Sequence, residues 1–204
     1  RHGFAFPPME TRLEMLEEQL AIVGGLWSGE RGWSFAGKHY RVEDAWFEPS
    51  FAGRARPPLI VGTKGAHRAI RLAARHADHL NLYYNTPDMA RAAFLALDEE
   101  CRRIGRDPAS ITRSVLLGTV VGEDRARADG RRAAIARTFA FPGSPAEWQA
   151  ANGDVWLVGT PDEAAVTLRA FGAAGTDLVI FQDFLPKDLA MIDLLGSLAA
   201  GWAA

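Results

Sequence analysis

The pattern of apolar and polar residues predicts alternating strands and helices along most of the chain. Strands are predicted at 59–61, 80–83, 111–121 and 178–181, and the continuous apolar run 59–61 is typical of a strand covered on both faces. Apolar positions with helical spacing predict helices from Gly65 to Ala77, from Thr86 to Gly105, over 123–138 and from Thr160 to Gly175. Because parallel strands need such crossovers, this alternation predicts a parallel sheet.

The ends of the chain and two segments between the strands have other patterns. A long amphipathic helix is predicted over Met9–Trp27, and a last helix over about 187–200. Aromatic and apolar residues on both sides of a glycine predict a hairpin over 33–45. Residues 123–138 are rich in Arg and Ala, which predicts a largely exposed helix, and residues 139–155 have no clear period and predict an irregular excursion.

The stretch from Pro57 to Asn81 reads as strand, glycine turn, helix and strand. Its turn is Gly62-Thr63-Lys64-Gly65, which places backbone N–H groups and a helix N-terminus at the carboxyl end of a parallel strand. That arrangement suits an anion, most often a phosphate. The glycines are equally consistent with a turn that has no ligand.

Composition excludes several classes of function. The chain has 204 residues, a net charge of -2 and 48% hydrophobic residues, so no basic excess indicates a nucleic-acid partner. No apolar run reaches the roughly 20 residues that span a membrane. The single Cys101 excludes an internal disulfide framework and, because free thiols persist in reducing compartments, predicts a cytoplasmic protein.

Two architectures fit this order of elements: an open doubly wound sheet and a (β/α)8 barrel. A barrel needs eight strands and typically ~250 residues, whereas four core strands are predicted here. The chain also begins at Arg1 with a helix and no preceding strand. We therefore expect the second half of a TIM barrel, with about four βα units, as a single domain over 1–204.

Six segments in order resemble the bacterial luciferase-like monooxygenase family, and most closely its F420-dependent oxidoreductase branch. They are HGFAFPPMETRLEMLEEQLAIVGGLW, FAGKHYRVEDA, RPPLIVGTKG, AIRLAARHAD, IGRDPASIT and VGTPDEAAVTLRAFGAAGTD. The resemblance covers about residues 2–195 and implies a (β/α)8 barrel that uses coenzyme F420 or, alternatively, FMN. It also implies a small-molecule substrate, and it leaves a homodimer open.

The resemblance assigns the cofactor phosphate to one turn and the start of the helix after it. The matching residues here are Gly62, Thr63, Lys64, Gly65 and Ala66. Many relatives have a second glycine where Thr63 stands, so its hydroxyl would replace a backbone contact. The catalytic residues of the family lie mainly in the first half of the barrel and have no counterpart in this chain.

Further residues carry a functional and a purely structural interpretation. Asn81, near the end of its strand, either lines the cofactor cavity or packs within the barrel, because active sites of such barrels lie at the C-terminal face. His76, Asp78 and His79 lack the spacing of a helical zinc site, so we predict no metal site. Phe139 to Pro145 and Trp148 form either a lid or a surface excursion.

The sequence therefore predicts a flavin- or deazaflavin-dependent oxidoreductase that transfers hydride between its cofactor and a small organic substrate. The alternative is a non-catalytic flavin-binding or assembly module, or an inert half-barrel. A sheet of four strands would expose two edges, and exposed edges invite pairing with another chain.

Overall fold

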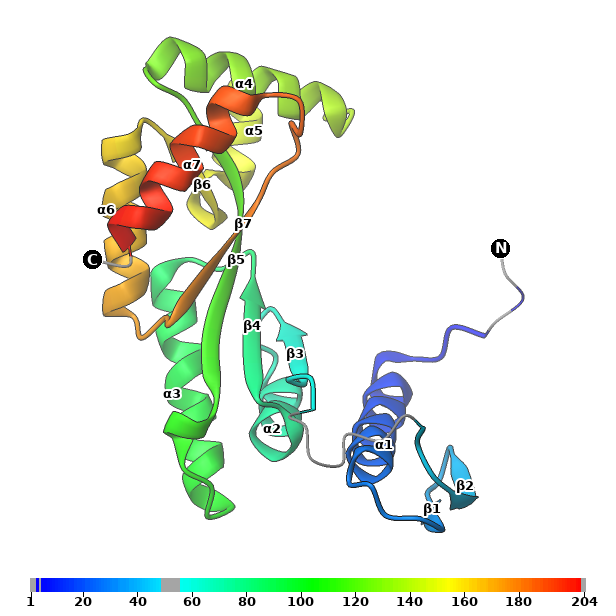
Figure 1. Ribbon diagram of the computed structural model, residues 1–204. Coiled ribbons are helices and arrows are strands. Elements are labelled where there is room, and N and C mark those ends of the chain that lie inside the picture. The colour runs from blue at the N-terminus through cyan, green and yellow to red at the C-terminus, as the bar shows by residue number, and fades with distance from the viewer. Residues whose placement is uncertain (1–2, 4, 49–55, 203–204) are drawn as a thin grey trace.

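The computed structural model describes residues 3, 5–48 and 56–202, and its main sheet follows the predicted alternation. Within this part of the chain the sheet has five strands, and every pairing between them is parallel, which confirms the prediction. The strands are β3 (Ile60–Thr63), β4 (His79–Tyr83), β5 (Thr112–Val121), β6 (Trp156–Gly159) and β7 (Leu178–Gln182). Figure 1 shows the long β5 running through the middle of the sheet.

Strand β6 adds to the four core strands that the sequence predicts. Because β5 has ten residues and β4 only five, β4 pairs with the first part of β5, Thr112–Leu116. The short β6 pairs with Gly118–Val121 beyond the end of β4, and β7 pairs with Ser114–Gly118 along the opposite edge. Strand β6 directly follows residues 139–155, which have no clear period in the sequence, so it is not counted among the predicted core strands.

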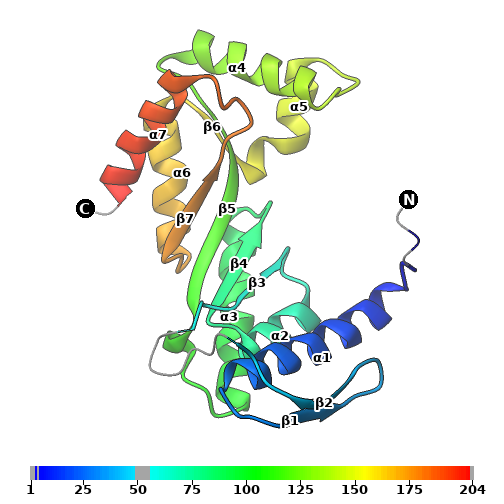
Figure 2. The same cartoon turned by 45° about the vertical axis from the view of Figure 1, so that its right-hand side comes forward.

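The structure contains the predicted helices α1 (Met9–Trp27), α2 (His67–His76), α3 (Pro87–Arg103), α4 (Arg125–Thr138), α6 (Pro161–Ala173) and α7 (Leu189–Trp202), and one further helix, α5 (Pro145–Asn152). Helices α1, α2, α3, α6 and α7 contribute to one core on one face of the sheet, whereas α4 and α5 pack with Trp156 in a second cluster (Figures 1 and 2). Alternate strand residues such as Leu80, Val115 and Leu117 are buried in the core that these helices cover. Cys101 on α3 is buried in the same core, as predicted.

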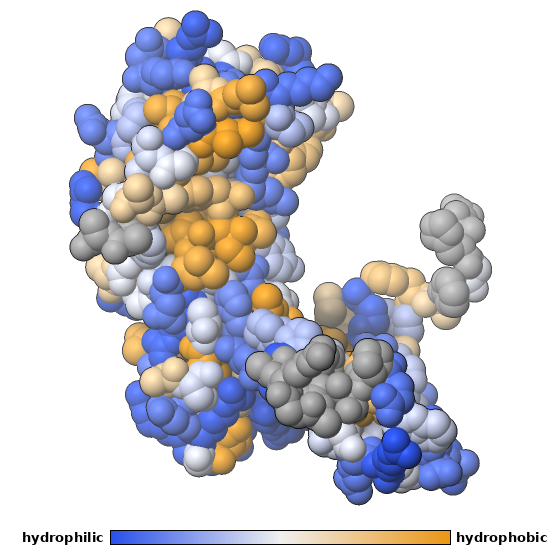
Figure 3. Space-filling view, in the orientation of Figure 1, coloured by the Kyte–Doolittle hydropathy of each residue, from blue (hydrophilic) through white to orange (hydrophobic). Residues whose placement is uncertain are grey.

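The opposite face of the sheet carries apolar side chains that no described element covers. Ile60 on β3 is 53% exposed and Leu178 on β7 is 44% exposed. Figure 3 shows apolar side chains gathered around the middle of the molecule, where β5 and β7 lie. In the described part of the chain no pairing joins β3 to β7. The sheet is therefore an open wall of parallel strands with helices on one face, in agreement with the predicted partial barrel.

Two segments differ from the prediction. Residues 145–152, expected within an irregular excursion, form α5, because Ser144 caps the helix, Pro145 occupies its first turn and the Glu147 carboxylate accepts from the Ser144 N–H at 2.6 Å. Helix α4, expected to be largely exposed, buries one face that includes Ile135 and Arg131. Its buried arginine escaped prediction because Arg is normally a surface residue.

The predicted hairpin is confirmed as β1 (Trp33–Ala36) paired antiparallel with β2 (Arg41–Ala45). Glu18 of α1 holds its turn, because its carboxylate accepts from the N–H groups of Lys38, His39 and Tyr40 at 2.7, 3.0 and 2.9 Å. Burial raises the pKa of Glu18, but these backbone donors outweigh it, and the pKa lies below its ordinary value.

We expect Glu18→Ala to loosen the hairpin turn without unfolding the sheet. The three N–H groups would lose their shared acceptor, so their exchange with deuterium should be on the order of tenfold faster. The measurement is hydrogen–deuterium exchange of the peptide that spans the turn. The matched control is Glu99→Ala, at an exposed position of α3. Equal exchange in both variants would contradict the tethering role of Glu18.

Candidate functional site

The turn after β3 has the conformation that the sequence predicts, with one addition. The strand continues through Gly62 and Thr63, and Gly65 adopts a φ of 102°, which a residue with a side chain rarely adopts. The Thr63 hydroxyl oxygen accepts from the N–H groups of Gly65 and Ala66 at 3.1 and 3.2 Å. Thr63 therefore stabilises the conformation of the turn. The backbone N–H groups that remain available to a ligand lie in the first turn of α2.

The N-terminus of α2 has no side-chain cap. Ala66 is its N-cap residue, and the first helical hydrogen bond runs from the Ile70 N–H to the Ala66 carbonyl at 3.0 Å. The N–H groups of residues 67–69 have no acceptor among the described residues. Helices α3 and α4, in contrast, are capped by Thr86 and Asp124. An uncapped N-terminus presents free donors and a partial positive charge.

Lys64 places a full charge beside this helix end. Its ammonium nitrogen lies 5.3 Å from the ring centre of Tyr84 and 5.8 Å from that of Tyr83. No carboxylate of the described residues pairs with it. Contacts of this kind orient a cation over an aromatic face without neutralising it. The charge of Lys64 therefore remains available at the carboxyl ends of β3 and β4.

Asn81 lies on the uncovered face of the sheet, level with Gly62 of β3 and Ser114 of β5. Its amide donates to the Ser114 hydroxyl oxygen at 2.7 Å, and the His79 Nε2 lies 2.5 Å from the same oxygen. Burial lowers the pKa of His79, so its imidazole is neutral at neutral pH. A Cβ added at Gly62 would meet nothing within 4 Å, so the sheet face beside Asn81 is open.

An aromatic cluster, defined here as Tyr84, Trp156 and Phe184 with Phe139 and Trp148, lies where β4 and β7 end and β6 begins. The Trp156 ring stacks against Phe184 with centres 5.4 Å apart and against Tyr84 at 6.4 Å. Phe139 and Trp148 meet Trp156 edge-on at 6.3 and 4.9 Å. Because Tyr84 also contacts Lys64, the cluster forms an apolar wall next to the predicted anion site.

Most of this cluster was not predicted from the sequence. Phe139 and Trp148 were expected in a lid or a surface excursion, whereas Trp148 is buried, with 2% exposed. The central Trp156 belongs to the unrecognised strand β6. A possible signal was Gly118 within an otherwise apolar strand, since glycine there marks close approach by another group. A Cβ at Gly118 would lie 2.5 Å from the Trp156 ring.

Two further features bear on ligand binding. The side-chain oxygens Asn85 Oδ1, after β4, and Gln182 Oε1, at the end of β7, are buried without a donor in the described part of the structure. Such acceptors are uncommon, and they are frequently satisfied by a ligand or water. Tyr84, immediately before Asn85, has a φ of 53°, a strained conformation of the kind that clusters at functional sites.

The histidines near Asp78 do not assemble a metal centre with it. Asp78 accepts from both Arg56 terminal nitrogens at 2.5 and 2.8 Å and from the Leu59 N–H at 2.7 Å, which anchors the start of β3. Burial lowers the pKa of His76. Within residues 3, 5–48 and 56–202, no three His, Cys, Asp or Glu side chains converge on one point.

The helices in this described part of the chain are too short or too polar to cross a bilayer.

Comparison with known proteins identifies relatives of this chain. F420-dependent hydroxymycolic acid dehydrogenase of Mycobacterium tuberculosis is 33% identical over 125 residues, which cover 60% of this chain and 33% of that protein. F420-dependent glucose-6-phosphate dehydrogenase of Microbacterium testaceum is 30% identical over 106 residues, covering 51% and 30%. The chain therefore spans about a third of the length of these curated relatives.

Solved structures show the same fold. EDTA monooxygenase from Chelativorans sp. BNC1 superposes with a TM-score of 0.74 at 18% identity, covering 98% of this chain and 62% of the other. An F420-dependent secondary alcohol dehydrogenase, solved with an F420-acetone adduct, gives a TM-score of 0.71 at 18% identity, covering 88% and 58%. The family model described as luciferase-like monooxygenase matches residues 1–178. This match extends over most of the chain, which therefore belongs to the luciferase-like monooxygenase family.

Proposed function

We propose that this chain is part of an F420-dependent oxidoreductase that transfers hydride between the coenzyme and a small organic substrate. The observation that carries the proposal is the uncapped N-terminus of α2 beside the unpaired Lys64, in a luciferase-like fold. Two relatives at 33% and 30% identity are F420-dependent dehydrogenases, which favours the deazaflavin over FMN.

The residues of the turn have separate roles in this proposal. The N–H groups of residues 67–69 and the Lys64 ammonium would hold the coenzyme phosphate, since both suit an anion. Thr63 would position the turn through its bonds to the Gly65 and Ala66 N–H groups. Gly62 leaves the adjoining sheet face open for close approach. Coenzyme F420, when bound, supplies the hydride chemistry.

The surroundings of the turn fit a planar ring system. The aromatic cluster supplies an apolar wall that would exclude water from one side of the site, and a dry site strengthens polar contacts within it. Asn85 Oδ1 and Gln182 Oε1 are acceptors that still lack donors in the described structure. Asn81 and the neutral His79 share the Ser114 hydroxyl, which fixes their side chains on the open sheet face.

A non-catalytic flavin-binding or assembly module is the second candidate function. It is favoured by the exposed Ile60 and Leu178 and by the outer edges of β3 and β7, which pair with no other strand among the described residues. Such edges are templates for pairing with another chain. Turnover of the coenzyme by the full-length protein would favour the enzyme, whereas binding without turnover, together with self-association in size-exclusion chromatography, would favour the module.

We expect Lys64→Met to weaken F420 binding about 10- to 100-fold, which corresponds to the loss of one charged hydrogen bond of ~1.5–3 kcal/mol. The measurement is fluorescence titration of the full-length protein with F420 and, separately, FMN. Lys38→Met is the matched control, because Lys38 pairs with Glu14 on α1, away from the turn.

The outcomes of this titration separate the parts of the proposal. Equal affinity in wild type and Lys64→Met would remove Lys64 from the site. Binding of FMN alone would remove the F420 assignment, and failure to bind either cofactor would overturn the proposed function.

A further inference from the structure

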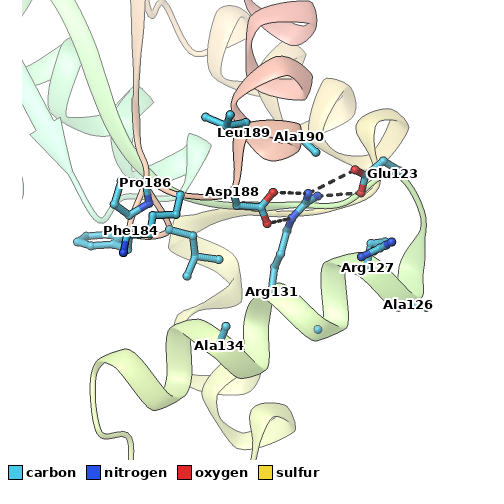
Figure 4. Close-up of a pocket in the computed structure, with 13 residues that line it drawn as sticks. Glu123, Ala126, Arg127, Arg131, Ala134, Phe184, Pro186, Asp188, Leu189 and Ala190 are labelled. Carbon is cyan, nitrogen blue, oxygen red and sulfur yellow. Dashed lines mark hydrogen bonds and ion pairs between the residues drawn. The ribbon is translucent and has the colours of Figure 1, made fainter.

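The groove between α4 and the segment 184–190 contains an arginine that serves the fold. The Arg131 guanidinium donates to Asp188 at 2.7 and 2.8 Å and to Glu123 at 2.9 Å. Figure 4 shows Arg131 reaching from α4 to these two carboxylates, so that it joins the two walls of the groove. The arginines over α2 are arranged differently.

A pocket of about 450 Å³ lies over α2 and is lined by residues of α1, α2 and α3. Its arginines are Arg68, Arg71 and Arg75 of α2 and Arg103 of α3. The three arginines of α2 follow one another at three- and four-residue spacing, which places them on one side of the helix. They form a row about 10 Å long at ~1.5 Å per residue.

This row begins at the proposed phosphate site. Arg68 lies in the first turn of α2, and its N–H is one of those that have no acceptor among the described residues. The side chain of the same residue lines the pocket. The pocket is therefore continuous with the helix end that would hold the coenzyme phosphate, and it leads away from that end along α2.

Carboxylates offset only part of the positive charge of the four arginines. Glu17 pairs with Arg75 at 2.7 Å, and Glu10, which is 82% exposed, lies 3.9 Å from Arg68. Glu100 is the third carboxylate, and it lines the pocket with Glu17. Three negative charges therefore face four arginines, which leaves one positive charge in excess.

The excess charge lies at Arg71, in the middle of the row. Arg71 forms no hydrogen bond or ion pair within the described residues, and the carboxylate that acts on it electrostatically is that of Glu100. Glu100 is only 8% exposed, accepts from Arg103 at 2.6 and 2.9 Å and lies 3.7 Å from the His67 Nε2. Because these cations share one carboxylate, the Arg71 guanidinium is available to a further anion.

We propose that this pocket binds the glutamate tail of coenzyme F420, with tail carboxylates at Arg68 and Arg71. The inference rests on the proposed function, since the tail continues from the phosphate. The tail is a chain of γ-linked glutamates, each with a free carboxylate, so it matches a row of guanidinium groups that suit carboxylates. A single small anion would occupy only one position of the row. FMN ends at its phosphate and would leave the pocket unused.

The test compares forms of the coenzyme that all contain the phosphate but carry either no glutamate or several glutamates. Their affinities for the full-length protein are measured by fluorescence titration. In wild type we expect the tail to increase affinity about three- to tenfold, since partly exposed ion pairs each contribute modestly. This gain should disappear when sodium chloride is raised to about 0.5 M, because salt screens such pairs.

Arg71→Gln should remove most of the gain and Arg71→Glu should reverse it, whereas both variants should bind the form without glutamates as wild type does. Arg71 is the position of choice, because its replacement breaks no hydrogen bond among the described residues and leaves Glu100 paired with Arg103. Arg91→Gln, at an exposed position of α3 outside the pocket, is the matched charge control. It should keep the full gain.

The outcomes separate this inference from the proposed function. Binding of the form without glutamates, with an affinity that the tail does not increase, would remove the tail site and leave the phosphate site intact. An equal gain in wild type and Arg71→Gln, or a gain that persists at high salt, would also overturn the inference. If no form of the coenzyme binds, the proposed function itself fails.

Discussion

Trp156→Ala is expected to lower the free energy of unfolding by about 3–5 kcal/mol, the usual cost of removing a large buried aromatic side chain. Trp156 is 5% exposed, contacts four aromatic rings and covers Gly118 of the central strand. Its loss would leave a cavity at the start of β6, beside Gly118 of β5, where the sheet restricts how far neighbouring side chains can move to fill it. Urea denaturation followed by circular dichroism measures the change.

The matched control is Trp46→Ala, because Trp46 is 59% exposed and its loss should cost little. Equal urea midpoints for wild type and Trp156→Ala would contradict the structural role of the cluster. A second variant isolates the packing itself. Gly118→Ala places a Cβ 2.5 Å from the Trp156 ring, so it should cost about 1–3 kcal/mol in wild type and clearly less in the Trp156→Ala background.

Arg131→Met is expected to cost about 3 kcal/mol, the lower end of the ~3–5 kcal/mol range for breaking a buried ion pair. The Arg131 side chain is only 8% exposed, whereas its partners Asp188 and Glu123 are 30% and 43% exposed. Those carboxylates would regain water when the arginine is lost, which moderates the penalty. Arg137→Met, at an exposed position of the same helix, is the control, and urea denaturation at pH 7 measures both.

The same variant should change how stability depends on pH. The hydrogen bond from Arg131 is the main cause that lowers the pKa of Asp188 below its ordinary value. The folded state therefore binds fewer protons than the unfolded state near that value, about 3.9 for Asp. The resulting stabilisation is present above this pH and is lost as the pH falls through the lower folded pKa. Arg131→Met should show a shallower loss of stability between about pH 5 and pH 3; curves parallel to wild type would contradict the pairing.

Local sequence determined the elements and much of the candidate site. The apolar runs and capping residues place β3, β4, β5 and β7 and the long helices close to their predicted positions. The turn after β3 follows from its glycines, since Gly65 needs a positive φ. Asn81 lies level with Gly62, because consecutive parallel strands pair in register. Each of these features depends on residues close in the sequence, or on a single strand–helix–strand crossover between β3 and β4.

Only the tertiary structure decided which distant residues meet. Trp156 covers Gly118 across 38 positions of the sequence, and Arg131 reaches Asp188 across 57, so neither contact leaves a local pattern. The Thr63 hydroxyl accepts hydrogen bonds from the Gly65 and Ala66 N–H groups, which were two of the predicted phosphate donors. The N–H groups that remain available are therefore those in the first turn of α2. The spacing of apolar residues in the sequence indicates which face of a helix or strand is buried. Tertiary packing determines which side chains from distant parts of the chain contact that face.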